Sequence, residues 1–162
     1  MERIDKINYY LDIAESVLER STCLRRKYGA VIVNNDEIVS TGYNGSPRGC
    51  TNCNEKGSCI REELNIPRGT KYELCSSVHA EQNALLSASR RETLAADIYL
   101  VGKSVVNDSF IMNTEPCSLC KKLIINSGIE NVHIRNSKKN NKIIKVENWI
   151  ENEENILGIK GY

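Results

Sequence analysis

Apolar residues in the first twenty positions recur every three or four residues, the spacing that places side chains on one face of a helix. These residues are Ile4, Ile7, Leu11, Ala14 and Leu18. The spacing predicts an amphipathic helix that ends near Ser21. A continuous apolar run at 30–33 then predicts a strand, and a turn at 34–36 joins it to a second strand at 37–41.

From residue 42 to residue 75 the apolar periodicity is lost and chain breakers accumulate. They are Gly42, Gly45, Pro47, Gly49, Gly57, Pro67 and Gly69. This composition predicts a loop, and a loop of this length needs either a function or something that holds it in place.

The later part of the chain alternates between helical and strand patterns. Helices are predicted at 79–89 and 117–126, the second closed by Gly128, and strands at 97–101 and around 132–134. Residues 105–112 are predicted as a hairpin turning at Asn107 and Asp108. A weaker edge strand and tail are expected through Ile143, Ile144, Val146 and Trp149. This alternation predicts one α/β domain over residues 1–162, with a central sheet between helices.

The overall charge is close to neutral, with 22 basic and 21 acidic residues. This balance argues against a strong electrostatic grip on nucleic acid or a membrane surface. The charged first residues do not fit a signal peptide, and no apolar run reaches membrane-spanning length. We therefore expect a cytoplasmic protein, in which seven cysteines indicate metal binding rather than disulfides.

Three residues form a plausible catalytic zinc site: His79, Cys117 and Cys120. Catalytic zinc takes three protein ligands and keeps one position open for water. Cys117 and Cys120 are three residues apart and would share one face of a helix. Pro116 suits the first turn of that helix, and the positive end of the helix dipole favours thiolate over thiol.

Glu81, two residues after His79, is the candidate proton shuttle of this site. Near the start of a helix its carboxylate can face a water at the open zinc position without being a ligand. Alone, C-x-x-C is more often a structural zinc corner or a redox pair, and H-x-E is common by chance. The two strings in order, with Pro116 before the first cysteine, resemble the H-x-E…P-C-x-x-C signature of zinc-dependent nucleobase deaminases.

Four further cysteines form a plausible second ligand set around the long loop. They are Cys23, Cys53, Cys59 and Cys75. A structural zinc held by four thiolates would clamp the loop to the elements on either side. Cys50 could replace Cys53 among these ligands, and the alternative is that all are small buried thiols.

Beyond the zinc motifs, the chain resembles the deoxycytidylate (dCMP) deaminases of the cytidine deaminase superfamily. The matching segments are 22–26, 29–33, 41–49, 66–69, 75–85 and 124–129. They extend from about the first helix to Arg135, and the Gly-Tyr-Asn-Gly-x-Pro segment at 42–47 points to dCMP deaminases within the superfamily.

The resemblance implies a three-layer fold with a mixed five-stranded sheet between helices, and zinc-dependent deamination of dCMP to dUMP. It also implies a homo-oligomer, commonly a hexamer, activated by dCTP and inhibited by dTTP. By position, Asn44 would contact the deoxyribose, the Ala80 N–H would bind the pyrimidine carbonyl, and Glu81 would transfer protons. Asn44 followed by glycine is equally a turn signal.

Two departures from the family pattern bear on the substrate. Tyr28 stands where a small apolar residue is usual and is a candidate pocket wall or an ordinary packed aromatic. The stretch 103–113 is longer than in many relatives and is expected over the active site or at a subunit contact. Arg26 is a candidate partner for a nucleotide phosphate.

Three rival functions remain open. One is another deaminase of the superfamily acting on dCTP or cytidine, another is a tRNA adenosine deaminase, and the third is a non-catalytic, zinc-stabilised nucleotide-binding module.

Overall fold

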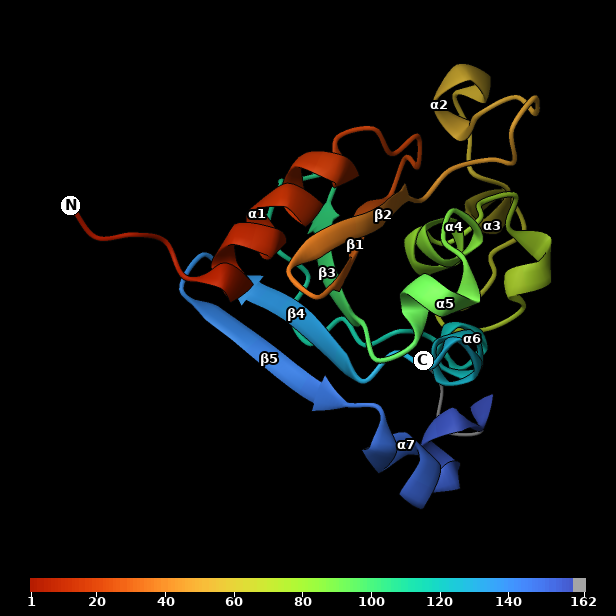
Figure 1. Ribbon diagram of the computed structural model, residues 1–162. Helices are drawn as coiled ribbons and strands as arrows, with labels where there is room; N and C mark the ends of the chain where they lie inside the picture. Colours follow the sequence, from red (N-terminus) through yellow and green to blue (C-terminus); the bar gives the residue numbers. More distant parts are fainter. Residues whose placement is uncertain (159–162) are drawn as a thin grey trace.

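A mixed five-stranded sheet forms the centre of the computed structural model, which describes residues 1–158 (Figure 1). The strands are β1 (Arg26–Asn34), β2 (Glu37–Tyr43), β3 (Asp97–Ser104), β4 (Asn131–Ser137) and β5 (Asn140–Lys145). Their order is β2-β1-β3-β4-β5, with β3 and β4 parallel and all other neighbours antiparallel. The predicted α/β class with a mixed five-stranded sheet is therefore confirmed.

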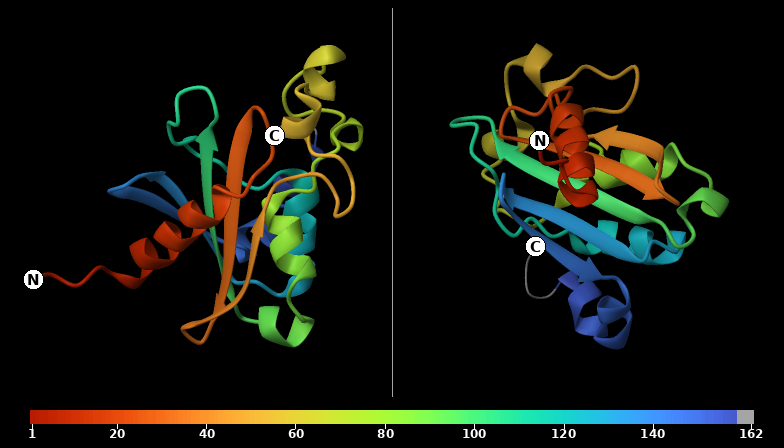
Figure 2. Two further views of the ribbon diagram at one scale, coloured as in Figure 1. Left: turned by 90° about the horizontal axis from the view of Figure 1, so that it is seen from above. Right: turned by 60° about the vertical axis from the view of Figure 1, so that its left-hand side comes forward.

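Helices cover both faces of the sheet. Helix α1 (Lys6–Leu18) lies on one face, and α4 (Ala80–Leu86) and α6 (Ser118–Ser127) lie on the other, as the view along the sheet in Figure 2 shows. The short helices α5 (Arg90–Thr93) and α7 (Glu147–Glu151) complete this second layer. Among residues 1–158, no helix has both the length and the apolar character needed to cross a bilayer.

Alternating side chains of β1 divide the buried residues between two cores. Val31 and Val33 pack beneath α1, whereas Ala30 and Ile32 belong to the core beneath α4 and α6. Because successive side chains of a strand point to opposite faces, a strand covered on both sides is apolar throughout. This explains the continuous apolar run in the sequence.

The long segment between β2 and α4 is ordered by short elements and one buried arginine. It contains α2 (Cys53–Lys56), α3 (Ile60–Glu63) and a 3₁₀ turn at Tyr72–Leu74. The Arg61 guanidinium is buried and donates to the carbonyl oxygens of Pro67, Thr70 and Lys71 at 2.8–3.0 Å. Arg61 thus fastens residues 67–71, a device that the sequence analysis missed.

Several predicted helix ends were wrong by about three residues. Helix α1 ends at Leu18 rather than near Ser21, and α4 ends at Leu86, where the chain turns into the separate helix α5. After β5 the predicted tail contains helix α7, which includes Trp149. These differences lie at element ends, which hydrophobic spacing defines weakly.

Residues 105–112 are not a hairpin of two strands. They fold back along β3, held by hydrogen bonds from the N–H groups of Ile111 and Ser104 and by one isolated bridge between Lys103 and Phe110. Phe110 packs against the core beneath α1. Of the longer stretch 103–113, which was expected over the active site or at a subunit contact, only Asn113 lines the main cavity. The segment therefore lies mainly beside β3 rather than over the cavity.

Candidate metal centre

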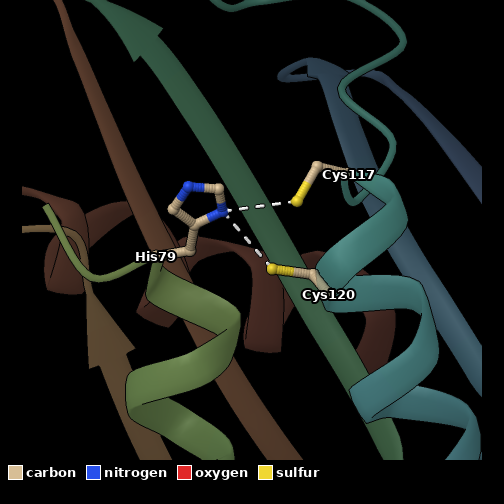
Figure 3. A group of neighbouring side chains, drawn as sticks. All are labelled: His79, Cys117 and Cys120. Atoms are coloured by element: carbon tan, nitrogen blue, oxygen red, sulfur yellow. Dashed lines mark hydrogen bonds between the residues drawn. The ribbon is translucent and has the colours of Figure 1, made fainter. Parts of the chain in front are cut away.

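Helices α4 and α6 start next to each other and bring three metal-ligand side chains together (Figure 3). His79 is the N-cap residue of α4, Cys117 is the N-cap residue of α6, and Cys120 lies in the first turn of α6. Pro116 precedes the cap of α6 rather than entering its first turn. The two helix starts supply the whole cluster.

The donor atoms of this cluster have the spacing of a tetrahedral zinc site. His79 Nδ1 lies 3.5 Å from Cys117 Sγ and 3.4 Å from Cys120 Sγ. All three donors lie within 4.8 Å of one another. Zinc about 2.0 Å from nitrogen and about 2.3 Å from sulfur, with tetrahedral angles, would separate those atoms by about 3.6 Å. One imidazole and two thiolates also match the ligand preference of zinc, so the residues present fit this ion.

Close packing of α4 on β2 fixes the position of His79. A Cβ atom on Gly42 would lie 2.2 Å from the carbonyl oxygen of Ala80, so only glycine allows this approach. Gly45 and Val78 exchange backbone hydrogen bonds at 3.2 and 2.8 Å. The His79 N–H donates to Gln82 Oε1 at 2.9 Å, which closes the start of the helix.

An aromatic contact orients the His79 ring. Tyr72 packs edge-on against it, with ring centroids 5.1 Å apart and an angle of 84° between the planes. Arg61 lies over the Tyr72 ring at 5.3 Å from its centroid. The buried arginine that fastens the loop therefore also supports the imidazole. Neither contact follows from local spacing, because Arg61 and Tyr72 belong to a loop that shows no regular periodicity.

The two thiols differ in acidity. Hydrogen bonds from Cys120 and His79 outweigh burial and lower the pKa of Cys117 to about 4. The pKa of Cys120 shifts the other way: its hydrogen bond to Cys117 and its burial raise it. For His79, burial depresses the pKa, but the Cys117 hydrogen bond and the Glu81 charge outweigh it, so the net pKa is raised. Cys117 is therefore the first thiolate of the cluster.

Glu81 lies beside these ligands, and burial raises the pKa of its carboxyl group. A carboxyl group with a raised pKa gains and loses protons closer to neutral pH, which suits a group that transfers protons.

The cluster opens into a cavity of about 410 Å³. Its wall includes seven residues that the sequence analysis assigned to the zinc site or the substrate: Arg26, Tyr28, Asn44, His79, Ala80, Glu81 and Cys117. Four segments far apart in the sequence, around residues 26–28, 44, 79–81 and 117, thus meet around one space.

The Asn44 side chain is buried and bound on several sides. Its Oδ1 accepts from the Tyr28 N–H at 2.8 Å and from Ser21 Oγ at 2.7 Å, and its Nδ2 donates to the Arg26 carbonyl at 2.9 Å. An asparagine side chain can make four such bonds. Among the described residues these partners leave one Nδ2 hydrogen for a ligand.

Tyr28 faces Gly102 across the pair formed by β1 and β3. A Cβ atom on Gly102 would lie 2.6 Å from Tyr28 Cε1, so the ring occupies space that a side chain on β3 would otherwise fill. The tyrosine at this unusual position is therefore a packed aromatic that also lines the cavity.

The four cysteines predicted as a second zinc site line the same cavity without forming a comparable cluster. Among residues 1–158, only His79, Cys117 and Cys120 bring three or more such donors within ligand distance of one another. Burial raises the pKa of Cys75, and Cys23 and Cys53 raise it further. Cys59 lines the cavity, and Cys50 is exposed.

Comparison with known proteins gives a matching family and several deoxycytidylate deaminases among the similar proteins. A family model described as the cytidine and deoxycytidylate deaminase zinc-binding region matches residues 4–136. A deoxycytidylate deaminase of Mycobacterium phage D29 is 37% identical over 137 residues, covering 82% of this chain and 95% of that protein.

A deoxycytidylate deaminase of Schizosaccharomyces pombe is also 37% identical, over 125 residues, but the match covers 77% of this chain and only 35% of that protein. The crystal structure of a dCMP deaminase from cyanophage S-TIM5 in apo form has a TM-score of 0.56 at 26% identity, covering 83% of this chain and 85% of that one.

The matched region contains every residue of the cluster and most of the cavity wall. With the ligand geometry in place, we conclude that the chain belongs to the cytidine and deoxycytidylate deaminase family.

Proposed function

We propose that this protein catalyses the zinc-dependent hydrolysis of dCMP to dUMP and ammonia. The observation that carries the proposal is the His79, Cys117 and Cys120 cluster at the wall of a cavity, with Glu81 beside it. The named activity of the phage D29 and cyanophage relatives, each matched over most of its length, supports dCMP as the substrate.

His79, Cys117 and Cys120 would hold the zinc ion. When bound, zinc supplies Lewis-acid activation of water, lowering the pKa of that water from about 15.7 toward about 7. Glu81 would take the proton that the water loses and deliver it to the ring nitrogen beside the amino-bearing carbon, while the water oxygen adds to that carbon. Through Glu81, the hydrogen of the added hydroxyl group would then pass to the amine as the carbon–nitrogen bond breaks, which leaves a carbonyl group and ammonia.

Three other groups would hold the nucleotide in place. Ala80 is the first residue of α4, so its N–H has no acceptor within the helix and can donate to the pyrimidine carbonyl. The remaining Nδ2 hydrogen of Asn44 can donate to the deoxyribose. Arg26 lines the cavity and is the proposed phosphate partner, with Arg68 as a second cavity arginine that the sequence analysis missed.

A panel of substrates tests this function against its rivals. Ammonia release should be measured with dCMP, CMP, dCTP, deoxycytidine and a tRNA. We expect turnover of dCMP to exceed that of the others. Preferred release from tRNA or dCTP would replace dCMP as the substrate, and no release from any of them would favour a non-catalytic nucleotide-binding module.

The Glu81→Gln variant tests the proton shuttle. It keeps the shape of the side chain and removes its ability to cycle a proton, so zinc content should stay at the wild-type level while turnover falls by at least 10²-fold. Turnover at the parent rate would contradict the role given to Glu81.

We also propose a second, structural zinc at Cys23, Cys53, Cys59 and Cys75. The cavity that all four thiols line, together with the effect of Cys23 and Cys53 on the pKa of Cys75, supports it. Metal analysis should then find about two zinc ions per chain, because four thiolates close a tetrahedral site. Cys75→Ser should remove one of them, and Cys50→Ser, at an exposed cysteine, should remove none. A wild-type value near one would refute the second site.

Assembly and regulation extend the proposal. Leu86, Leu119 and Leu123 are exposed on α4 and α6, and a groove of about 470 Å³ runs beside Leu86 and Leu123. An exposed apolar patch of this kind supports a homo-oligomer, a hexamer in the family pattern. Light scattering should give a mass that is a multiple of 18.2 kDa and that Leu86→Glu reduces.

Effector control by dCTP and dTTP is tested by repeating the dCMP assay with each nucleotide. We expect activation by dCTP and inhibition by dTTP.

The free state of all seven cysteines is consistent with a cytoplasmic location, where thiols stay reduced.

A further inference from the structure

The segment 146–157 returns to the cavity from a part of the chain that the family model does not cover. The family model matches residues 4–136 only, whereas Asn155 and Leu157 line the cavity that holds the metal cluster. The family pattern therefore gives no role to this segment. Leu157 remains about half exposed at the cavity, with 46% of its surface accessible.

This segment is anchored in the core rather than loosely attached. Val146 and Trp149 are both only 3% exposed and pack in the core beneath α4 and α6. The Val146 N–H donates to the Glu130 carbonyl at 2.9 Å, which ties the segment to the start of β4. The turn at Glu153–Ile156 then follows α7 and carries Asn155 to the cavity.

Lys121 joins the segment to the metal-binding helix. It follows Cys120 on α6, and its Nζ donates to the Asn155 carbonyl at 3.2 Å and lies 5.1 Å from the Trp149 ring centroid. Glu115 accepts from the same Nζ at 3.1 Å and keeps the ammonium paired. The position of Asn155 is therefore fixed relative to the first turn of α6.

These contacts place the segment at the metal end of the cavity. Its neighbour there is Lys121 of α6, whereas the proposed phosphate partners Arg26 and Arg68 come from β1 and the long loop. Leu157, a half-exposed leucine in the wall of the cavity that holds the metal cluster, would lose its contact with water when an apolar, planar group enters.

We propose that segment 146–157 forms the wall of the substrate site that faces the pyrimidine, with Leu157 in contact with the base and Lys121 as the positioning residue. This inference rests on the proposed function and deepens it. Leu157 contributes binding energy that is equal in the ground state and the transition state, so it lowers KM without changing kcat.

The test compares Leu157→Ala with Leu157→Met and with Ile150→Ala in the dCMP assay. Ile150 belongs to the same segment, is 55% exposed, and does not line the cavity. We expect Leu157→Ala to raise KM about five-fold, the loss for a partly buried apolar contact, with kcat within about two-fold. Leu157→Met should restore most of the affinity, and Ile150→Ala should behave as wild type.

Inhibition by dUMP and by deoxyuridine tests whether Leu157 contacts the base or the phosphate, because the two compounds share the base and only dUMP carries a phosphate. Leu157→Ala should weaken both inhibitors by the same factor. Zinc content and the emission of Trp149, the one tryptophan in the sequence, should stay unchanged in this variant and exclude a misplaced segment as the cause.

Equal KM values for Leu157→Ala and Ile150→Ala, in an enzyme that turns over dCMP, would overturn the inference and leave the proposed function intact. Weakened binding of dUMP alone would also overturn it, since the wall would then face the phosphate. A wild type that neither deaminates nor binds these nucleotides would refute the proposed function and the inference together.

Discussion

Gly42 has no room for one more carbon atom. Its ideal Cβ would lie 2.2 Å from the Ala80 oxygen and 2.4 Å from the Ala84 nitrogen. Both atoms belong to the backbone of α4, so the clash cannot be relieved by moving a side chain. The absence of a side chain on β2 therefore sets how closely α4, with His79 at its start, approaches the sheet.

Gly42→Ala should displace α4 and weaken the metal centre. We expect a loss of about 1–3 kcal/mol in the free energy of unfolding, the usual cost of overpacking, together with reduced zinc content and activity. Urea unfolding and metal analysis measure these effects. Thr41→Ala is the control, because Thr41 is exposed on the same strand. A fully active, zinc-loaded Gly42→Ala enzyme would contradict this account.

The residues that sequence analysis identified best are those whose chemistry is local. His79, Cys117 and Cys120 belong to two short motifs, so their pairing in space could be predicted. Arg61 and Tyr72 could not, because their roles depend on a loop whose path no periodicity describes. For Asn44, the turn reading was wrong, because its backbone is neither left-handed nor in a turn, and its contact with the deoxyribose stays a prediction.

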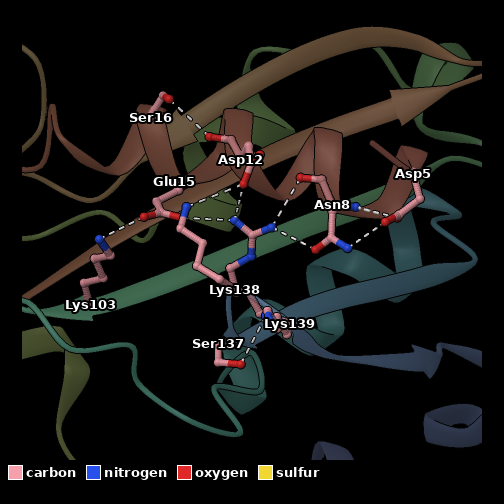
Figure 4. A network of polar contacts seen from close by, with 10 residues as sticks. Asp5, Asn8, Asp12, Glu15, Ser16, Lys103, Ser137, Lys138 and Lys139 are labelled. Atoms are coloured by element: carbon pink, nitrogen blue, oxygen red, sulfur yellow. Dashed lines mark hydrogen bonds and ion pairs between the residues drawn. The ribbon is translucent and has the colours of Figure 1, made fainter. Parts of the chain in front are cut away.

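At the scale of elements, α1 is joined to β4 by a buried arginine. Arg135 is 1% exposed and contacts Asp12, Glu15 and Asn8 of α1 at 2.6–3.3 Å. Figure 4 shows the carboxylate of Glu15 between Lys103 and Lys138. These partners are more than 100 residues apart in the sequence. Hydrophobic spacing therefore predicted α1 and β4 as separate elements but could not predict the ion pairs that join them.

The connection should weaken in acid. Burial pushes the Glu15 pKa up, but hydrogen bonds from Lys138 and Lys103 outweigh it, so the pKa lies below its ordinary value of 4.5. A depressed pKa gives stability that is fully present above pH 4.5 and lost as the pH falls through the pKa of the folded state.

Glu15→Gln should therefore reduce the free energy of unfolding by about 1–3 kcal/mol at pH 7, since Arg135 loses a charged partner. The difference from wild type should shrink as the pH falls below 4.5, where wild-type Glu15 becomes neutral too. Urea unfolding across this pH range measures it, with Glu37→Gln as the exposed control. A difference that does not change with pH would contradict the ion-pair explanation.

For the whole molecule, zinc would join two helices that the sheet already holds. The cores on both sides of the sheet consist of apolar residues from strands and helices and do not depend on the metal. The starts of α4 and α6 are different, because His79, Cys117 and Cys120 meet there and belong to neither apolar core. Removing zinc should therefore loosen this end of the molecule while the sheet stays folded.

Chelation with dipicolinic acid should lower the melting temperature without abolishing the folded state. A ligand present at about 1,000 times its Kd stabilises the folded chain by about 4 kcal/mol, which corresponds to a shift of roughly 8–16 °C for a chain of this size. The circular dichroism signal of the sheet should persist at 25 °C. Added zinc should restore both the melting temperature and dCMP turnover. Magnesium should restore neither, because thiolate ligands disfavour that ion. Complete unfolding on chelation would mean that the metal, rather than the two apolar cores, holds the fold together.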